Sequence, residues 1–270
     1  MEDFFIAEHP VTNGEYLEFL DDLARRDGVM AAKARSPRRA GGAPETSYLV
    51  ERGGRLELAE ADAEGDAWRP GHPVVAIPWH DTVAYCAWRS ERDGRQVRLP
   101  TELEWEKAAR GVDGRWFPWG NRFDPSCCNM TESRRPGEDV RVSVEDMESR
   151  FPADLSAYGV RGCGGNVREW TATTGPGDRG PRVVRGGCWC FLRILTRCAS
   201  RSLSGPTLVL DEVGFRCSAT IEPSWCSGGP SSWSGSRTCG CASTRSGRRS
   251  SPSRQGSRSS GSGWNDTGCD

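Results

Sequence analysis

A chain of 270 residues with 36 basic and 37 acidic side chains is nearly neutral, so no global electrostatic attraction to nucleic acid or to an anionic membrane is expected. The first ten residues, MEDFFIAEHP, contain no basic segment and no long apolar run, which predicts neither a signal peptide nor a membrane span and favours a cytoplasmic location. The twelve cysteines are therefore expected to be free thiols. No CxxC pair occurs, which argues against a zinc ribbon.

A helix and a hairpin are predicted near the start of the chain. Thr12 or Asn13 is placed to cap a helix with an apolar face, made of Tyr16, Leu17, Leu20 and Leu23. Residues 31 to 71 are poor in aliphatic side chains, and within them 48–50 is predicted to pair with 56–58 across two glycines.

Two further helices are predicted between residues 81 and 111. Asp81 is expected to cap the first, which ends at Gly94. Its apolar stripe is expected to consist of Val83, Ala84, Cys86, Ala87 and Trp88. Thr101 and Glu104 have the spacing of a capping box, so they predict the start of the second helix, which ends at Gly111.

The segment from residue 182 to residue 217 has a regular frame and an irregular interior. A β-like run at 182–185 is followed by Gly186 and Gly187, and another run lies at 213–217. Paired glycines after a strand indicate a backbone that a side chain would obstruct. The apolar residues between the two runs follow neither a two-residue nor a 3.6-residue period.

The last fifty residues have a different composition. Residues 221–270 are rich in Ser, Gly and Arg, and after Ile221 they contain no Leu, Ile, Val, Phe or Met. Such a segment buries too little apolar surface to offset its ordering entropy. We therefore expect a disordered tail at 221–270 after a domain at 1–220.

Seven segments resemble, in order, motifs of the formylglycine-generating-enzyme or sulfatase-modifying-factor domain. They are PVTNGEYLEFL (10–20), HPVVAIPWHDTVAYCAW (72–88), RLPTELEWEKAARG (98–111), FPWG (117–120), GNVREW (165–170), RGG (185–187) and GFR (214–216). Several spaced motifs in one order make the resemblance specific. It covers about residues 4–218 and implies an α+β, C-type-lectin-like fold, loop-rich, with short strands and two or three helices.

The resemblance leaves three functions open, because a fold does not decide a function. Family members that oxidise cysteine to formylglycine have two copper-binding cysteines, four and nine positions after the second glycine. Those positions are Phe191 and Thr196 here, so the resemblance does not supply the pair. A displaced pair, Cys190 and Cys198, remains the basis of a copper-oxidase alternative, although buried small hydrophobes are the simpler interpretation. A structural or interaction domain is a second alternative.

A different branch matches the end of the domain better. RGGCW, RCASR and VGFRC resemble the variable proteins of diversity-generating retroelements, in which a lectin-type frame is constant and adenine-directed mutagenesis varies selected codons. The varied codons end in C and cannot encode Lys, Glu, Gln, Met or Trp, and none of these occurs from Cys190 to Asp211.

This second resemblance implies a variable, ligand-binding surface within about 188–211. Its first group of positions is Cys188, Cys190, Phe191, Leu192, Arg193, Ile194, Leu195 and Thr196. Its second group is Ser200, Ser202, Leu203, Ser204, Thr207, Leu208, Leu210 and Asp211. An exposed apolar surface indicates a contact site, so the leading hypothesis is a non-enzymatic binding protein whose partner is a protein and not a nucleic acid.

The resemblance also implies a calcium site at residues 165–169. The carboxylate of Glu169 and the backbone carbonyls of Gly165 and Val167 would be its ligands. Family members place Asp or Asn where this chain has Gly162, so one oxygen is missing, and calcium prefers six or more. A hydrogen-bonded structural carboxylate is the alternative role for Glu169.

Overall fold

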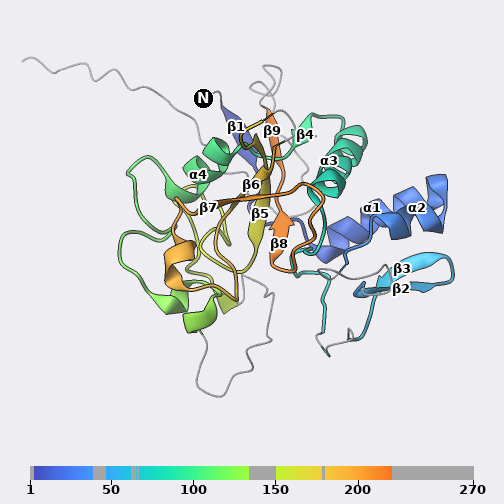
Figure 1. Cartoon of the computed structure of the whole chain (residues 1–270), viewed down its shortest axis with the longest axis horizontal. Helices are drawn as coiled ribbons and strands as arrows, with labels where there is room; N and C mark the ends of the chain where they lie inside the picture. Colours follow the sequence, from blue (N-terminus) through green and yellow to red (C-terminus); the bar gives the residue numbers. More distant parts are fainter. Residues whose placement is uncertain are drawn as a thin grey trace, which may run out of the picture.

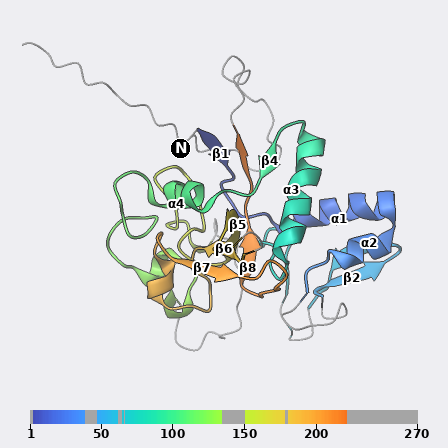
Figure 2. The ribbon, with the colours of Figure 1, turned by 45° about the horizontal axis from the view of Figure 1, so that its top comes forward.

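The computed structural model describes residues 3–38, 47–61, 65, 67–133, 150–177 and 180–220. Figures 1 and 2 show the main sheet in the middle of the molecule, with helix α4 (Glu102–Arg110) on one side. On the other side lie α1 (Asn13–Asp27), α2 (Val29–Ala34) and the hairpin of β2 (Leu49–Arg52) and β3 (Arg55–Leu58). The fold is α+β, as predicted, with short strands and long connections. The predicted tail, 221–270, lies outside the described residues.

The main sheet has four strands in the order β7-β6-β5-β8. The strands are β5 (Arg168–Thr174), β6 (Arg182–Arg185), β7 (Arg201–Ser204) and β8 (Val213–Phe215). β6 is antiparallel to both neighbours, whereas β5 and β8 are parallel. Strands are therefore found at both predicted runs, and β7, which is an edge strand, lies between them in the sequence.

A second sheet joins the two ends of the described chain. Its order is β1-β9-β4, with β1 at Phe4–Ile6, β9 at Ser218–Thr220 and β4 at Val97–Arg98. β9 pairs antiparallel with both neighbours. The last described strand is thus the central strand of its sheet.

Helix α1 (Asn13–Asp27) begins where the sequence predicts. The hydroxyl oxygen of Thr12 accepts a hydrogen bond from the Glu15 backbone, and the Glu15 carboxylate accepts one from the Thr12 backbone. This capping box satisfies two backbone N–H groups that the helix leaves unpaired. A short helix, α2 (Val29–Ala34), follows directly.

Helix α3 (Trp79–Asp93) differs from the prediction at its start and on its face. Its N-cap is Pro78, and Asp81 lies in the first turn, where its carboxylate forms a 2.7 Å ion pair with the Arg35 guanidinium. The face that packs inward centres on Tyr85, Cys86 and Trp88, and Val83 is exposed. The helix does end at Gly94, which takes a left-handed conformation.

Helix α4 (Glu102–Arg110) and the hairpin confirm the local predictions. Thr101 and Glu104 form the expected capping box, and Gly111 follows the last helical turn. Strands β2 (Leu49–Arg52) and β3 (Arg55–Leu58) pair antiparallel across the two glycines. The larger hydrophobic core lies between α1, α3 and the main sheet, and a smaller one lies under α4.

Candidate functional site

The glycine pair after β6 is held by close backbone contacts. Gly186 has a φ of +82°, which side chains rarely adopt. A β-carbon on Gly187 would lie 2.6 Å from the carbonyl oxygen of Gly164. Both glycines are buried, so the chain leaves the sheet at this point in a fixed direction.

The segment after the glycines turns outward. Leu192, Ile194, Leu203 and Leu208 have exposed fractions of 57%, 65%, 43% and 51%. Cys190, Arg193 and Thr207 are also exposed. A third set is half-buried: Phe191, Leu195, Ser200, Ser202, Ser204, Leu210 and Asp211. Cys188 and Thr196 are buried, so their side chains take no part in an exposed surface.

The first part of this segment rests on an adjacent loop. The Thr131 backbone donates a hydrogen bond to the Phe191 carbonyl, and the Arg193 backbone donates one to the Glu132 carboxylate. The Arg193 guanidinium also lies over the Phe123 ring, 5.7 Å from its centroid. These contacts fix the short 3₁₀ helix η4 (Arg193–Thr196), which presents Ile194 to solvent.

Arg168 connects the two predicted groups of positions, and the sequence prediction missed it. It is the first residue of β5 and is buried. Its guanidinium lies 5.4 Å from the Phe191 ring centroid and donates a hydrogen bond to the Ser202 hydroxyl. Burial lowers the pKa of Arg168. The only sequence signal was a charge inside a strand-like run, which does not reveal these distant contacts.

Two thiols meet at the base of the segment. The Cys188 and Cys190 sulfur atoms are 3.1 Å apart, with Cys188 buried and Cys190 exposed. Burial, followed by the contact with Cys190, raises the pKa of the Cys188 thiol. Arg168 lies within electrostatic range of both sulfurs.

The residues expected to bind calcium do not fit that ion. Both carboxylate oxygens of Glu169 accept hydrogen bonds from Arg216, each of 2.7 Å, and one also accepts a 2.9 Å bond from the Trp105 indole. A guanidinium thus lies where a cation would bind. Among the described residues no group of three or more His, Cys, Asp or Glu side chains is placed to hold a metal. These hydrogen bonds favour the structural role for Glu169 over calcium binding at Gly165, Val167 and Glu169.

The copper alternative also lacks its ligands at the expected places. Phe191 and Thr196 provide no sulfur, and Cys198 is buried in the core under α4. Of the proposed displaced pair, Cys190 contacts Cys188. The donor set for a Cu(I) site of the family's spacing is therefore absent from these positions.

Asp154 is a second residue that sequence reasoning missed. It is fully buried, and it accepts hydrogen bonds from the Gly164 backbone at 3.0 and 3.1 Å. Burial raises its pKa to about 7, although these backbone donors and Arg216 act in the opposite direction. Its carboxylate thus holds in place the backbone at Gly164, whose carbonyl oxygen lies close to Gly187.

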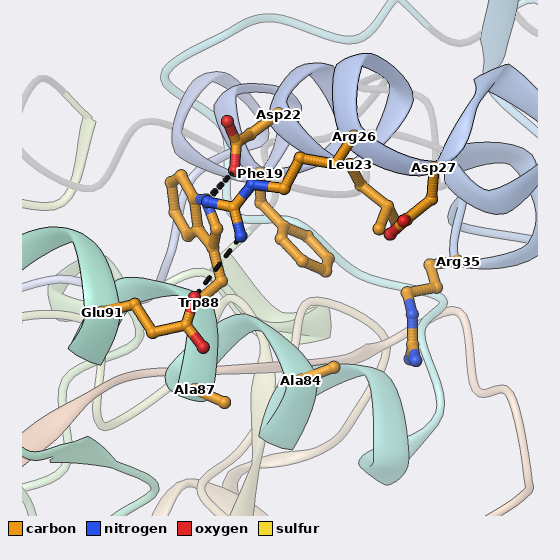
Figure 3. A pocket seen from close by; sticks show the side chains of 10 residues that line it. All are labelled: Phe19, Asp22, Leu23, Arg26, Asp27, Arg35, Ala84, Ala87, Trp88 and Glu91. Carbon is orange, nitrogen blue, oxygen red and sulfur yellow. Dashed lines mark hydrogen bonds and ion pairs between the residues drawn. The ribbon is translucent and has the colours of Figure 1, made fainter.

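A hollow of about 240 Å³ lies between α1 and α3 (Figure 3). Arg26 reaches across it, with ion pairs of 2.5 Å to Asp22 and 3.4 Å to Glu91. The Trp88 indole donates a 3.0 Å hydrogen bond to Asp22. Because Arg26 pairs with these acidic side chains, we interpret the hollow as part of the packing interface between α1 and α3 and not as a ligand site.

In the described ranges no helix is long and apolar enough to cross a membrane.

The family described as the sulfatase-modifying factor enzyme 1-like domain matches residues 1–221. The chain is 38% identical over 158 residues to an inactive C-alpha-formylglycine-generating enzyme 2 of Mus musculus, which covers 55% of this chain and 49% of that relative. It thus spans about half the length of that protein.

Two other similarities extend over most of the chain. A formylglycine-generating enzyme of Streptomyces coelicolor is 32% identical over 256 residues, covering 80% of this chain and 78% of that enzyme. The solved structure of Treponema denticola variable protein 1 superposes with a TM-score of 0.52 at 18% identity, covering 81% of this chain and 84% of that one. Because the family match extends over most of its length, this chain belongs to the sulfatase-modifying factor enzyme 1-like domain family and has the α+β, C-type-lectin-like fold of the formylglycine-generating-enzyme type.

Proposed function

We propose that the protein is a non-enzymatic binding protein that presents the segment Cys190–Asp211 to a protein ligand. The observation that carries the proposal is the exposure of four large aliphatic side chains, Leu192, Ile194, Leu203 and Leu208, on a segment that leaves the sheet at a buried glycine pair. Large apolar side chains exposed at a surface favour association with another macromolecule.

The surroundings of the segment support this role. Arg193 and Thr207 add exposed polar groups beside the aliphatic ones, as a protein interface with an apolar centre and a polar rim requires. Two of the anchoring atoms belong to the backbone, the Phe191 carbonyl and the Arg193 amide. These two hydrogen bonds do not depend on which side chains stand at positions 191 and 193.

The fold comparison is consistent with a variable protein of a diversity-generating retroelement. A genomic observation tests this origin: a near-copy of the 3′ end of the gene beside a reverse transcriptase gene, with mismatches at adenines of the copy. We expect the mismatches to fall in codons for exposed or half-buried positions of 190–211. A locus without such a copy would contradict this origin.

An oxidase assay separates binding from catalysis. Purified protein loaded with Cu(I) is incubated with oxygen and a cysteine-containing sulfatase peptide, and formylglycine is measured by mass spectrometry. The Streptomyces coelicolor relative is the positive control. We expect no product, because Phe191 and Thr196 occupy the ligand positions. Turnover that is lost in Cys190→Ser would contradict the proposed function and support the oxidase alternative.

A further inference from the structure

The two cysteines at the start of the exposed segment differ sharply in accessibility. Cys188 is fully buried, whereas Cys190 is exposed. Their sulfur atoms are 3.1 Å apart, which places one thiol within reach of solvent reagents and the other behind it. Neither position belongs to the ligand spacing of the copper enzymes, and Cys188 lies outside the segment proposed above to contact a ligand.

The backbone around the pair holds this arrangement. The Phe191 amide donates a 3.2 Å hydrogen bond to the Cys188 carbonyl, which closes a turn over the two intervening residues. The Trp189 amide donates a 3.1 Å bond to the Asn166 carbonyl. These two hydrogen bonds hold the turn against the loop before β5, so the backbone keeps the two sulfur atoms close together.

The difference in burial favours reaction at the exposed sulfur. The thiolate is the nucleophilic form of cysteine, and burial raises the pKa of the Cys188 thiol. Cys190 is open to reagents in solution, so it is the sulfur that reacts first.

We propose that Cys188 and Cys190 form a redox-active dithiol that low-molecular-weight disulfides, such as oxidised glutathione, convert to an intramolecular disulfide. The Cys190 thiolate attacks one sulfur of glutathione disulfide, the S–S bond breaks, and one glutathione thiolate leaves. The Cys188 sulfur then attacks the Cys190 sulfur of the mixed disulfide and displaces the second glutathione, while the Cys188 proton passes to a departing thiolate. Two protein thiols are oxidised and one glutathione disulfide is reduced to two thiols.

The bridge formed in this way is readily reversible. Disulfides that are exposed or strained have higher reduction potentials than buried structural ones, and one of these two sulfurs faces solvent. The oxidation state therefore follows the ratio of reduced to oxidised glutathione. A second close pair, Cys86 and Cys217, has its sulfurs 3.9 Å apart, but both cysteines are buried. That pair is a matched internal control that the reagent does not reach in the folded protein.

The chain provides a direct measurement. Trypsin cleavage after Arg185 and Arg193 gives a peptide, GGCWCFLR, that contains both cysteines and no other. The full chain is incubated with glutathione buffers of increasing oxidised fraction, denatured in N-ethylmaleimide and digested. We expect this peptide to lose both maleimide groups and two hydrogens together as the oxidised fraction rises, and excess reduced glutathione to restore both maleimide groups.

Variants give the order of the two steps. In Cys188→Ser, or Cys188→Ala if the serine variant does not fold, we expect one stable glutathione adduct on Cys190, because the second thiol is missing. In Cys190→Ser we expect Cys188 to carry only maleimide, added after denaturation. A wild-type peptide with two maleimide groups at every ratio, or with a persistent glutathione adduct, would overturn the proposal. So would an adduct on Cys188 in Cys190→Ser.

Discussion

The guanidinium of Arg216 donates two hydrogen bonds of 2.7 Å to the two carboxylate oxygens of Glu169, and both side chains are fully buried. Arg216 also donates to the carbonyls of Ala7, Glu8 and Arg161. One side chain thus ties the start of the chain, the loop before β5 and the main sheet together. A charge pair at such a junction holds the frame on which the exposed segment depends.

Loss of one partner of this pair should be severely destabilising. Removing one charge from a buried pair leaves the other uncompensated and costs about 3–5 kcal/mol. We expect Arg216→Met to lower the free energy of unfolding by this amount in urea titrations. The matched control is Arg201→Ala, which breaks the partly exposed Arg201–Glu102 pair and should cost at most about 1 kcal/mol. Equal losses in the two variants would contradict the structural role of Glu169.

Calcium should leave the stability of the protein unchanged. A ligand that binds the folded state raises the melting temperature, but Arg216 already occupies both oxygens of Glu169. We expect the same melting temperature in millimolar calcium and in chelator. A rise with calcium that disappears in Glu169→Gln would show that the ion displaces the guanidinium.

The exposed aliphatic side chains should be replaceable without loss of the fold. We expect the combined change of Leu192, Ile194, Leu203 and Leu208 to Ser to cost about 0.5 kcal/mol or less at each position, as for surface substitutions. The control is Phe215→Ala, at a fully buried ring, which should cost about 3–5 kcal/mol. Thermal denaturation compares the two variants. Collapse of the quadruple variant alone would mean that the segment belongs to the core.

The stability should depend on pH through Asp154. Its pKa is raised from 3.8 to about 7 by burial, so between these values the folded chain keeps a proton that the unfolded chain has lost. Stability from this group is therefore full below pH 4 and falls as the pH rises to 7. The difference amounts to at most about 4 kcal/mol.

The Asp154→Asn variant isolates this effect. Its amide cannot ionise, and its oxygen still accepts a hydrogen bond from the Gly164 backbone. We expect the free energy of unfolding of the variant, relative to the wild type, to increase between pH 4.5 and pH 7.5. An unchanged difference across this range, measured in urea, would show that Asp154 is ionised in the folded protein throughout.

The glycine after β6 should not tolerate a methyl group. In Gly187→Ala the new carbon would lie 2.6 Å from the Gly164 carbonyl oxygen and 3.1 Å from the Leu195 carbonyl oxygen, so the backbone must move. We expect a loss of at least about 1–3 kcal/mol, as for overpacking. Gly205→Ala is the control, because its nearest contact is a Leu208 side-chain atom at 3.4 Å. Tolerance of both variants would mean that the turn is not rigid.

The sequence predicted the elements whose causes are local. The capping boxes at Thr12 and Thr101 and the glycine-linked hairpin each depend on residues within a few positions of one another. The predicted start of α3 was wrong by three positions: the N-cap is Pro78, and Asp81 lies in the first turn, where it pairs with Arg35, 46 positions earlier in the chain.

The site was less predictable because its contacts join distant segments. The exposure of Leu192 and Ile194 could be expected from their irregular spacing. The bond from Arg168 to Ser202, 34 positions later, joins β5 to β7 on the far side of β6. The pairing of Glu169 with Arg216, 47 positions later, depends on the parallel placement of β5 beside β8. No local pattern encodes that placement.

The position of β9 in the middle of its sheet bears on how the protein is made. Among the described strands, β1 and β4 are joined through β9 alone, so this sheet stays unassembled on the ribosome until residues 218–220 have emerged. Pairings between residues so distant form slowly, and they can form only after the exposed segment has been synthesised. The exposed segment is thus translated before the frame closes around it, and a substitution that traps the chain at this stage would expose it to proteolysis before the fold is complete.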